Sequence, residues 1–230
     1  MNTIQLLGRK TILFTEHLGR IGIMFFQAIR YILFNPPQPR YIYEQMYKIG
    51  VLSLPVVLIT GATTGMILIV QTYAQLHRLS IENVSGIIVG LSMTNELGPV
   101  LTGLMVAGRV GAAIAAELGT MRVTEQIDAL HSMAISPVRF LIVPRFIAAV
   151  ILMPILTSFS IFFGIVGAYI VAVETLGMNG VFFMKNLWEN TGLTDLADGL
   201  IKAVFFGFII VMIGCYKGFT AGGGAEGVGR

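Results

Sequence analysis

The sequence predicts an all-α polytopic membrane protein, and its composition and its charge distribution are the two observations that predict it. Of the 230 residues, 55% are hydrophobic and 12% are charged, whereas a soluble domain carries about 25% charged residues. The mean hydropathy is +0.82, and the charges leave long uncharged runs between them. Since so little polar surface cannot cover a water-soluble globule, we expect a single membrane domain.

Four segments are long and apolar enough to cross a bilayer, which requires roughly 20 apolar residues in a helix. These expected spans are 49–76, 83–108, 146–173 and 199–216. Glu96 alone interrupts the second span, whose helix we expect to continue to about Gly119. Lys202 lies near one end of the fourth span, where a long side chain can carry its ammonium to the membrane surface. Residues 174–198 are expected to form a mildly acidic loop, and a glycine-rich tail follows at 222–230.

Residues 1–48 differ from the rest because charged residues recur along an otherwise apolar stretch. The uncharged run Ile21–Ile29 is too short to span a bilayer. The pattern predicts an amphipathic helix that lies in the membrane interface. Asn35–Pro39 contains three prolines, which end that helix because proline removes a backbone donor and disfavours helix at the residue before it. We therefore separate this segment from a transmembrane domain at 49–230.

The distribution of Lys and Arg predicts the orientation, because cytoplasmic segments carry an excess of positive charge. The N-terminal segment has six of these residues, the first link one, the middle loop four and the acidic loop two. This alternation places the N-terminus and the middle loop in the cytoplasm. No basic run is interleaved with aromatic residues, so we expect no nucleic-acid binding.

Glu96 is the strongest candidate for a functional residue, because an ionisable group in mid-span is costly and generally faces a cavity or a partner. It lies in Asn95-Glu96-Leu97-Gly98-Pro99. Pro99 has no N–H and so frees the carbonyl of Asn95, which predicts a kinked or unwound backbone suited to a substrate pathway. A structural alternative stays open, in which Glu96 is a buried carboxyl paired with a hydroxyl or amide of a neighbouring helix.

Small residues recur at four-residue spacing, which favours close packing of helices in lipid. These residues are the pair Gly61 and Gly65, the row Gly108, Ala112 and Ala116, and the row Gly111, Ala115 and Gly119. In the polar middle loop we expect a short helix around Thr120–Met133, with Arg122, Glu125 and Asp128 on one face. From the spacing alone, a solvated face is favoured over a docking surface for a cytoplasmic partner.

No sequence motif indicates an enzyme or a metal site. The chain has no G-x-x-x-x-G-K-[ST] phosphate loop, no HExxH and no GxSxG, and its three histidines are scattered. The lone cysteine, Cys215, excludes an internal disulfide and a structural zinc site. We therefore expect no cofactor or metal in this chain, and any ATP that drives it would be hydrolysed by another chain.

Several stretches closely resemble the MlaE permease family. They are Asn95–Leu101, Ala107–Gly111, Ala116–Leu130, Pro137, Pro144-Arg145 and Gly223–Arg230. The resemblance implies the homodimeric core of an ABC transporter in the bacterial inner membrane, which moves phospholipids between the inner and outer membranes and so maintains outer-membrane lipid asymmetry. Its implied partners are a cytoplasmic ATPase dimer that binds ATP and Mg²⁺, a periplasmic hexamer of MCE-domain proteins and, in many members, a small STAS-domain protein.

The resemblance also assigns roles to individual residues. It implies a lipid cavity between protomers at Glu96, together with Asn95, Leu97 and Pro99. It implies a coupling helix that docks into the ATPase, which reverses the solvated-face interpretation of the middle loop. The coupling residues would be Met121, Arg122, Thr124, Glu125, Gln126 and Asp128. The family continues with a further membrane helix, so a fifth span is expected beyond Arg230. The alternative function is an ion-coupled carrier or channel that uses Glu96 as its proton or cation site.

Overall fold

The computed structural model describes residues 3–79 and 81–221, and every described element is a helix. Within these residues, four helical segments are long and apolar enough to cross a membrane: Pro39–Leu79, Ser85–Val123, Val138–Thr175 and Leu193–Phe219. This confirms the expected all-α polytopic architecture. The glycine-rich tail at 222–230 lies outside the described residues.

The chain folds into two compact units, which we describe separately. Unit 1 comprises Met1–Gln45, Gly111–Ile147 and Val211–Arg230, and unit 2 comprises Met46–Val110 and Ala148–Ile210. Two long helices, α8 (Val143–Ile170) and α10 (Leu193–Phe219), each contribute residues to both units. The expected boundary between residues 48 and 49 remains a prediction.

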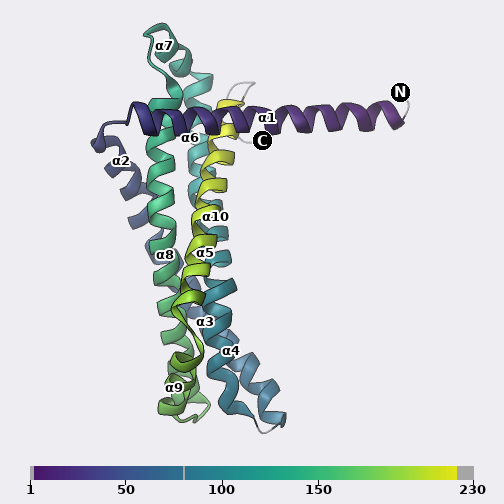
Figure 1. The fold of residues 1–230 in the computed structure, drawn as a ribbon, viewed down its shortest axis with the longest axis vertical. Coiled ribbons are helices and arrows are strands. Elements are labelled where there is room, and N and C mark those ends of the chain that lie inside the picture. The colour runs from purple at the N-terminus through teal and green to yellow at the C-terminus, as the bar shows by residue number, and fades with distance from the viewer. Residues whose placement is uncertain (1–2, 80, 222–230) are drawn as a thin grey trace. The chain divides into compact units, whose positions relative to one another are not determined.

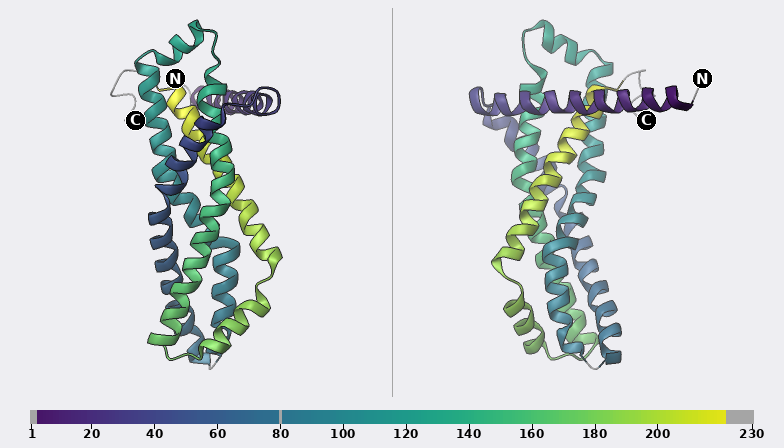
Figure 2. Two further views of the ribbon diagram at one scale, coloured as in Figure 1. Left: turned by 90° about the vertical axis from the view of Figure 1, so that its left-hand side faces the viewer. Right: turned by 45° about the vertical axis from the view of Figure 1, so that its right-hand side comes forward.

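Unit 1 begins with α1 (Thr3–Phe34), one uninterrupted helix that Figure 1 shows from the side and the left view of Figure 2 shows nearly end-on. It ends immediately before the proline-rich segment, as predicted, and α2 (Pro39–Met46) starts on the last of those prolines. The ring of Phe25 packs against Phe146 with centroids 6.4 Å apart. His17 shares a hydrogen bond with the hydroxyl of Tyr216. The location of α1 in a membrane interface remains a prediction.

The middle of unit 1 is formed by α6 (Ala112–Val123), α7 (Gln126–Ser132) and the π-helical turn η6 (Val138–Ile142). One predicted row of small residues packs against glycines of α10. A Cβ added at Gly214 would lie 3.1 Å from the carbonyl oxygen of Gly111, and one at Gly218 would lie 3.1 Å from that of Ala115 and 3.3 Å from the nitrogen of Gly119. In contrast, Ala112 and Ala116 of the other row are exposed.

Unit 2 contains most of α8, the first two thirds of α10 and a series of shorter helices. These are η1 (Tyr47–Val51), α3 (Leu54–Leu76), η2 (His77–Leu79), η3 (Glu82–Val84), α4 (Ser85–Ser92), η4 (Met93–Leu97), α5 (Gly98–Val106), most of η5 (Ala107–Gly111), η7 (Val171–Thr175) and α9 (Gly180–Asn190). The predicted Gly61 and Gly65 pair lies where α3 crosses α8. A Cβ at Gly61 would lie 2.7 Å from the carbonyl oxygen of Ser160, and one at Gly65 would overlap the carbonyl of Gly164.

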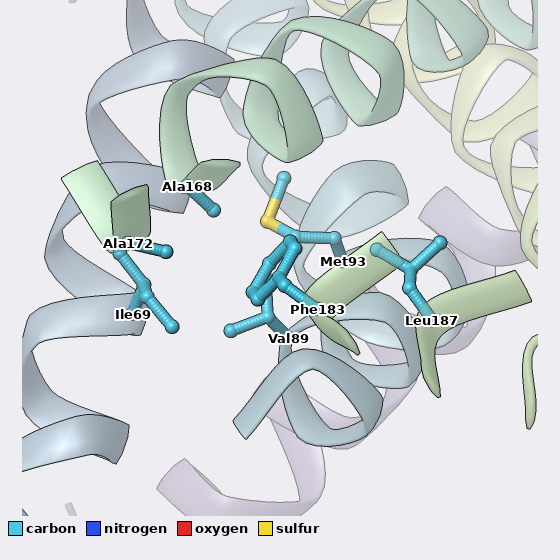
Figure 3. Close-up of a cluster of buried hydrophobic side chains, with 7 residues drawn as sticks. All are labelled: Ile69, Val89, Met93, Ala168, Ala172, Phe183 and Leu187. Carbon is cyan, nitrogen blue, oxygen red and sulfur yellow. The ribbon is translucent and has the colours of Figure 1, made fainter. Parts of the chain in front are cut away.

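The core of unit 2 is a cluster of buried side chains from α3, α4, η4, α8, η7 and α9 (Figure 3). Its members are Ile69, Val89, Met93, Ala168, Ala172, Phe183 and Leu187. Phe183 and Leu187 lie four residues apart on α9, so they share one face of that helix. The acidic loop expected at 174–198 was therefore wrong in part, because it contains α9 and the first turns of α10. The side chain of Asn179 stabilises the start of α9 by accepting hydrogen bonds from the backbone of Val181 and Phe182, at 3.0 and 3.3 Å.

Candidate functional site

Glu96 forms an ion pair with Lys202 of α10. The Lys202 Nζ lies 2.7 Å from the Glu96 Oε1, and 67% of the Glu96 side chain is exposed on the surface of unit 2. Both residues lie within candidate membrane spans. In such a place each charge reduces the cost of the other. The partner of Glu96 is therefore a cation, and not the hydroxyl or amide of the structural alternative. The expected position of Lys202 near the end of its span was wrong, because α10 begins nine residues earlier, at Leu193.

Lys202 makes a second bond that Pro99 explains. Because proline has no N–H, it leaves the carbonyl of Asn95 without its usual helical donor, and Lys202 Nζ donates to that oxygen at 2.8 Å. The backbone stays helical through η4, a single π-helical turn in which the N–H of Gly98 bonds to the carbonyl of Met93. The expected kink or unwinding is thus a wider turn in a continuous helix, a feature frequent at functional sites.

Asn95 connects this turn to the beginning of α10. Its amide Nδ2 donates to Asp195 Oδ1 at 3.2 Å, and Asp195 Oδ2 accepts the backbone N–H of Gly192 at 2.8 Å. Gly199 permits the close approach, because a Cβ there would overlap the carbonyl of Thr94. We call Asn95, Glu96, Asp195 and Lys202 the polar cluster.

A cavity of about 820 Å³ adjoins the polar cluster in unit 2. It is lined by Thr94, Ser158, Ile161, Phe162, Ile165, Val166, Tyr169, Met184, Leu187, Trp188, Thr191, Gly192, Leu193 and Leu196. None of the four residues predicted for a lipid cavity is among its lining residues. Of these, Leu97 packs against the core cluster and Pro99 is buried, while Asn95 and Glu96 belong to the polar cluster.

The middle loop differs from the single helix expected at Thr120–Met133. Glu125 has a left-handed backbone with φ of 59°, which ends α6 at Val123 and starts α7 at Gln126. Arg122, Glu125 and Asp128 therefore do not share a helical face, and that expectation was wrong. Arg122 and Asp128 instead form an ion pair across the turn, with Nη1 and Oδ1 2.5 Å apart. Of the predicted coupling residues, Met121 is half-buried, and Arg122, Thr124, Glu125, Gln126 and Asp128 are exposed.

Unit 1 contains an ion pair with a buried arginine, and the sequence did not predict it. Arg145 Nη2 lies 2.8 Å from Glu117 Oε2, with 4% of the arginine side chain and 43% of the glutamate side chain exposed. Arg145 Nη1 also donates to the carbonyl of Leu141 at 2.6 Å. An arginine directly after a proline at the start of an apolar span was the available signal, but its partner lies 28 residues away.

Over residues 3–79 and 81–221, no three His, Cys, Asp or Glu side chains meet in a way that could hold a metal ion.

The polar cluster offers one exposed carboxylate, a second carboxylate, an amide and one ammonium. Such a set can bind the charged groups of a ligand by exchanging the Glu96 and Lys202 pair for bonds to that ligand.

Comparison with known proteins gives consistent matches. The family described as Permease MlaE matches residues 42–230. A probable ABC transporter permease protein of Rickettsia typhi is 44% identical over 230 residues, which is all of this chain and 89% of the relative. A probable ABC transporter permease protein of Synechocystis is 40% identical over 89% of this chain and 78% of the relative. The intermembrane phospholipid transport system permease protein MlaE of Haemophilus influenzae is 39% identical over the full chain and 88% of the relative.

Proposed function

Because this chain belongs to the MlaE permease family, we propose that it is the permease subunit of an ABC transporter that moves phospholipids between the inner and outer membranes. A separate ATPase subunit would supply the energy. The multi-pass fold and the transporter permeases among the relatives support this function. The phospholipid substrate is supported by the name of the Haemophilus relative.

The observation that carries the proposal is the exposed ion pair between Glu96 and Lys202 within two membrane spans. A phospholipid headgroup brings a phosphate, which the ammonium of Lys202 can bind, and many headgroups also bring an amine that Glu96 can bind. Such exchange keeps every charge paired, so the headgroup does not have to leave an unpaired charge in the membrane. Bound lipid shifts the transport cycle only if one conformation binds it more tightly than the other.

The assembly that we propose follows the family. Two copies of the chain form the core in the inner membrane, with the N-terminus in the cytoplasm. A cytoplasmic ATPase dimer, which binds ATP and Mg²⁺, docks at the turn between α6 and α7. The ion pair of Arg122 and Asp128 bridges this turn. A periplasmic MCE-domain hexamer receives the lipid, and a STAS-domain protein can sit on the ATPase.

The test is ATP-driven transfer of a labelled phospholipid by the reconstituted complex. We expect Glu96→Gln and Lys202→Met to reduce transfer at least tenfold while the complex still assembles. Lys185→Met is the matched control, because Lys185 forms an exposed ion pair with Glu189 on α9 and neither residue belongs to the polar cluster. Wild-type transfer by both cluster variants would refute the role of the pair.

The competing function is an ion-coupled carrier or channel centred on Glu96. It is less well supported, because Lys202 already neutralises this carboxylate in the described structure. The same reconstitution separates the two functions. Transport that follows a proton gradient and needs no ATP would favour the carrier.

A further inference from the structure

The cavity in unit 2 is chemically suited to hydrocarbon. No charged side chain lines it, and most of its lining residues are aliphatic or aromatic. Among its polar residues, Ser158 already donates to the carbonyl of Pro154 at 2.9 Å. A charged or strongly hydrated ligand would lose its water there without compensation, whereas an apolar ligand would not.

The cavity is lined by buried residues on one part of its wall and by exposed residues on another. Thr94, Ile161 and Leu187 form its floor and are buried, with Ile161 5% exposed. Phe162, Trp188 and Leu193 form its mouth, with Trp188 71% exposed. Leu187 also belongs to the core cluster of Figure 3, so the floor rests on packed side chains. The mouth opens from segments that lie within or beside candidate membrane spans, where lipid is the solvent.

The dimensions of the cavity match one hydrocarbon chain. Along α8 its lining runs from Ser158 to Tyr169, a length of roughly 16 Å at the helical rise of 1.5 Å per residue. Half of a bilayer's hydrocarbon core is about 15 Å thick, which is the depth that one acyl chain occupies. The volume of about 820 Å³ also falls within the range of about 300–1,000 Å³ that is typical of ligand pockets.

The cavity and the polar cluster adjoin at two points. Thr94 of the floor directly precedes Asn95, and Leu193 and Leu196 of the lining flank Asp195. An amphiphile with a charged head and an apolar tail satisfies both the polar cluster and the apolar lining.

We propose that this cavity binds one acyl chain of a glycerophospholipid whose headgroup lies at the polar cluster, within a single protomer. The proposal rests on the proposed function and adds to it the seat of the lipid tail. It differs from the cavity between protomers expected from the family resemblance, because every lining residue comes from unit 2 of one chain.

The experiment is photolabelling of the assembled full-chain complex in vesicles of phosphatidylethanolamine that carry a trace of a phospholipid with a diazirine on one acyl chain. Labelled residues are then identified by mass spectrometry. Bulk lipid reaches exposed residues, so only the floor is informative. We expect labels on Ile161 and Leu187, and none on Leu156, which is equally buried on α8 but does not line the cavity. Equal labelling of Leu156 and the two floor residues would overturn the proposal.

Two variants of α8 complete the test. Val166→Phe fills the cavity and should reduce floor labelling to the level of Leu156. Ile170→Phe makes a similar increase in size at an exposed position outside the lining and should leave floor labelling unchanged. Floor labelling that persists in Val166→Phe would show that the acyl chain reaches these residues by a route other than the cavity, which would overturn the proposal. If the floor is labelled but the complex does not transfer phospholipid with ATP, the proposed function is rejected and the binding site is retained. If the complex transfers phospholipid but the floor is not labelled, only the acyl-chain site is rejected.

Discussion

The ammonium of Lys202 lies 2.7 Å from the carboxylate of Glu96, although 106 residues separate them in the sequence. The same ammonium donates a hydrogen bond to the carbonyl of Asn95, which has lost its usual helical donor because residue 99 is a proline. One lysine thus joins two membrane helices of unit 2 at a π-helical turn. The arrangement keeps a charged pair accessible where the surrounding segments are apolar.

Exchanging the two charges distinguishes a structural role of this pair from a role in binding lipid. In the double variant Glu96→Lys with Lys202→Glu, the ion pair can re-form, but the ammonium no longer lies beside the Asn95 carbonyl. We expect the double variant to assemble like the wild type and to transfer phospholipid at least tenfold more slowly. Recovery of full transfer in the double variant, after loss in each single variant, would assign the pair a purely structural role.

The crossing of α3 and α8 should not accept a side chain at Gly65. A Cβ there meets the backbone carbonyl of Gly164, which cannot rotate away. We expect Gly65→Ala to lower the free energy of unfolding by about 1–3 kcal/mol, the usual cost of overpacking. Thermal unfolding in detergent measures the change. Gly22→Ala on α1, where nothing lies within 4 Å of an added Cβ, serves as the control and should unfold at or above the wild-type temperature, since alanine favours helix.

The buried pair of Arg145 and Glu117 should respond unequally to the loss of either partner. Glu117→Gln leaves a cation in an almost completely buried place, whereas Arg145→Met leaves a carboxylate that is 43% exposed. We expect Glu117→Gln to destabilise the protein more, on the order of 3 kcal/mol. Denaturant unfolding of the two variants in the same detergent gives the comparison. Equal destabilisation, or a greater effect of Arg145→Met, would contradict this account of the pair.

The turn between α6 and α7 allows docking to be separated from folding. Glu125 has φ of 59°, a conformation that glycine adopts without strain. Glu125→Gly should therefore keep or raise stability while it removes a side chain proposed to contact the ATPase. Ala134→Gly relieves a similar backbone, with φ of 58°, at a position outside the predicted coupling residues.

Affinity for the ATPase, measured by co-purification at graded salt, should fall for Glu125→Gly and not for Ala134→Gly. If both glycine variants retain the ATPase equally, the Glu125 side chain does not contribute to docking.

Features with a local signal in the sequence could be predicted. The four spans follow from uncharged runs, and the end of α1 follows from Pro36 and Pro37. The π-helical turn at Met93–Leu97 was only indicated, because Pro99 shows that a carbonyl loses its donor and does not show what replaces it. The partner, Lys202, depends on how two distant helices pack. It appeared to lie near a helix end because Asp195 and Asp198 make the first turns of α10 look like a loop.

The backbone conformation of the middle loop also could not be predicted from the sequence. A spacing of three residues is equally compatible with one helix and with two helices around a turn, and the left-handed Glu125 selects the second. Glycine or asparagine is the usual signal for such a turn, and this sequence has neither there. The α9 helix was missed for a related reason, since a helix of 11 residues that buries only Phe183 and Leu187 resembles an apolar loop segment.

Trp188, at the mouth of the cavity, is the sole tryptophan in the sequence. This residue is 71% exposed, so its emission depends on what occupies the space beside it. Intrinsic fluorescence of this chain is therefore a label-free optical reporter of cavity occupancy. With partner proteins whose own tryptophans have been replaced by phenylalanine, energy transfer from Trp188 to a lipid-borne acceptor would follow lipid entry and exit in real time.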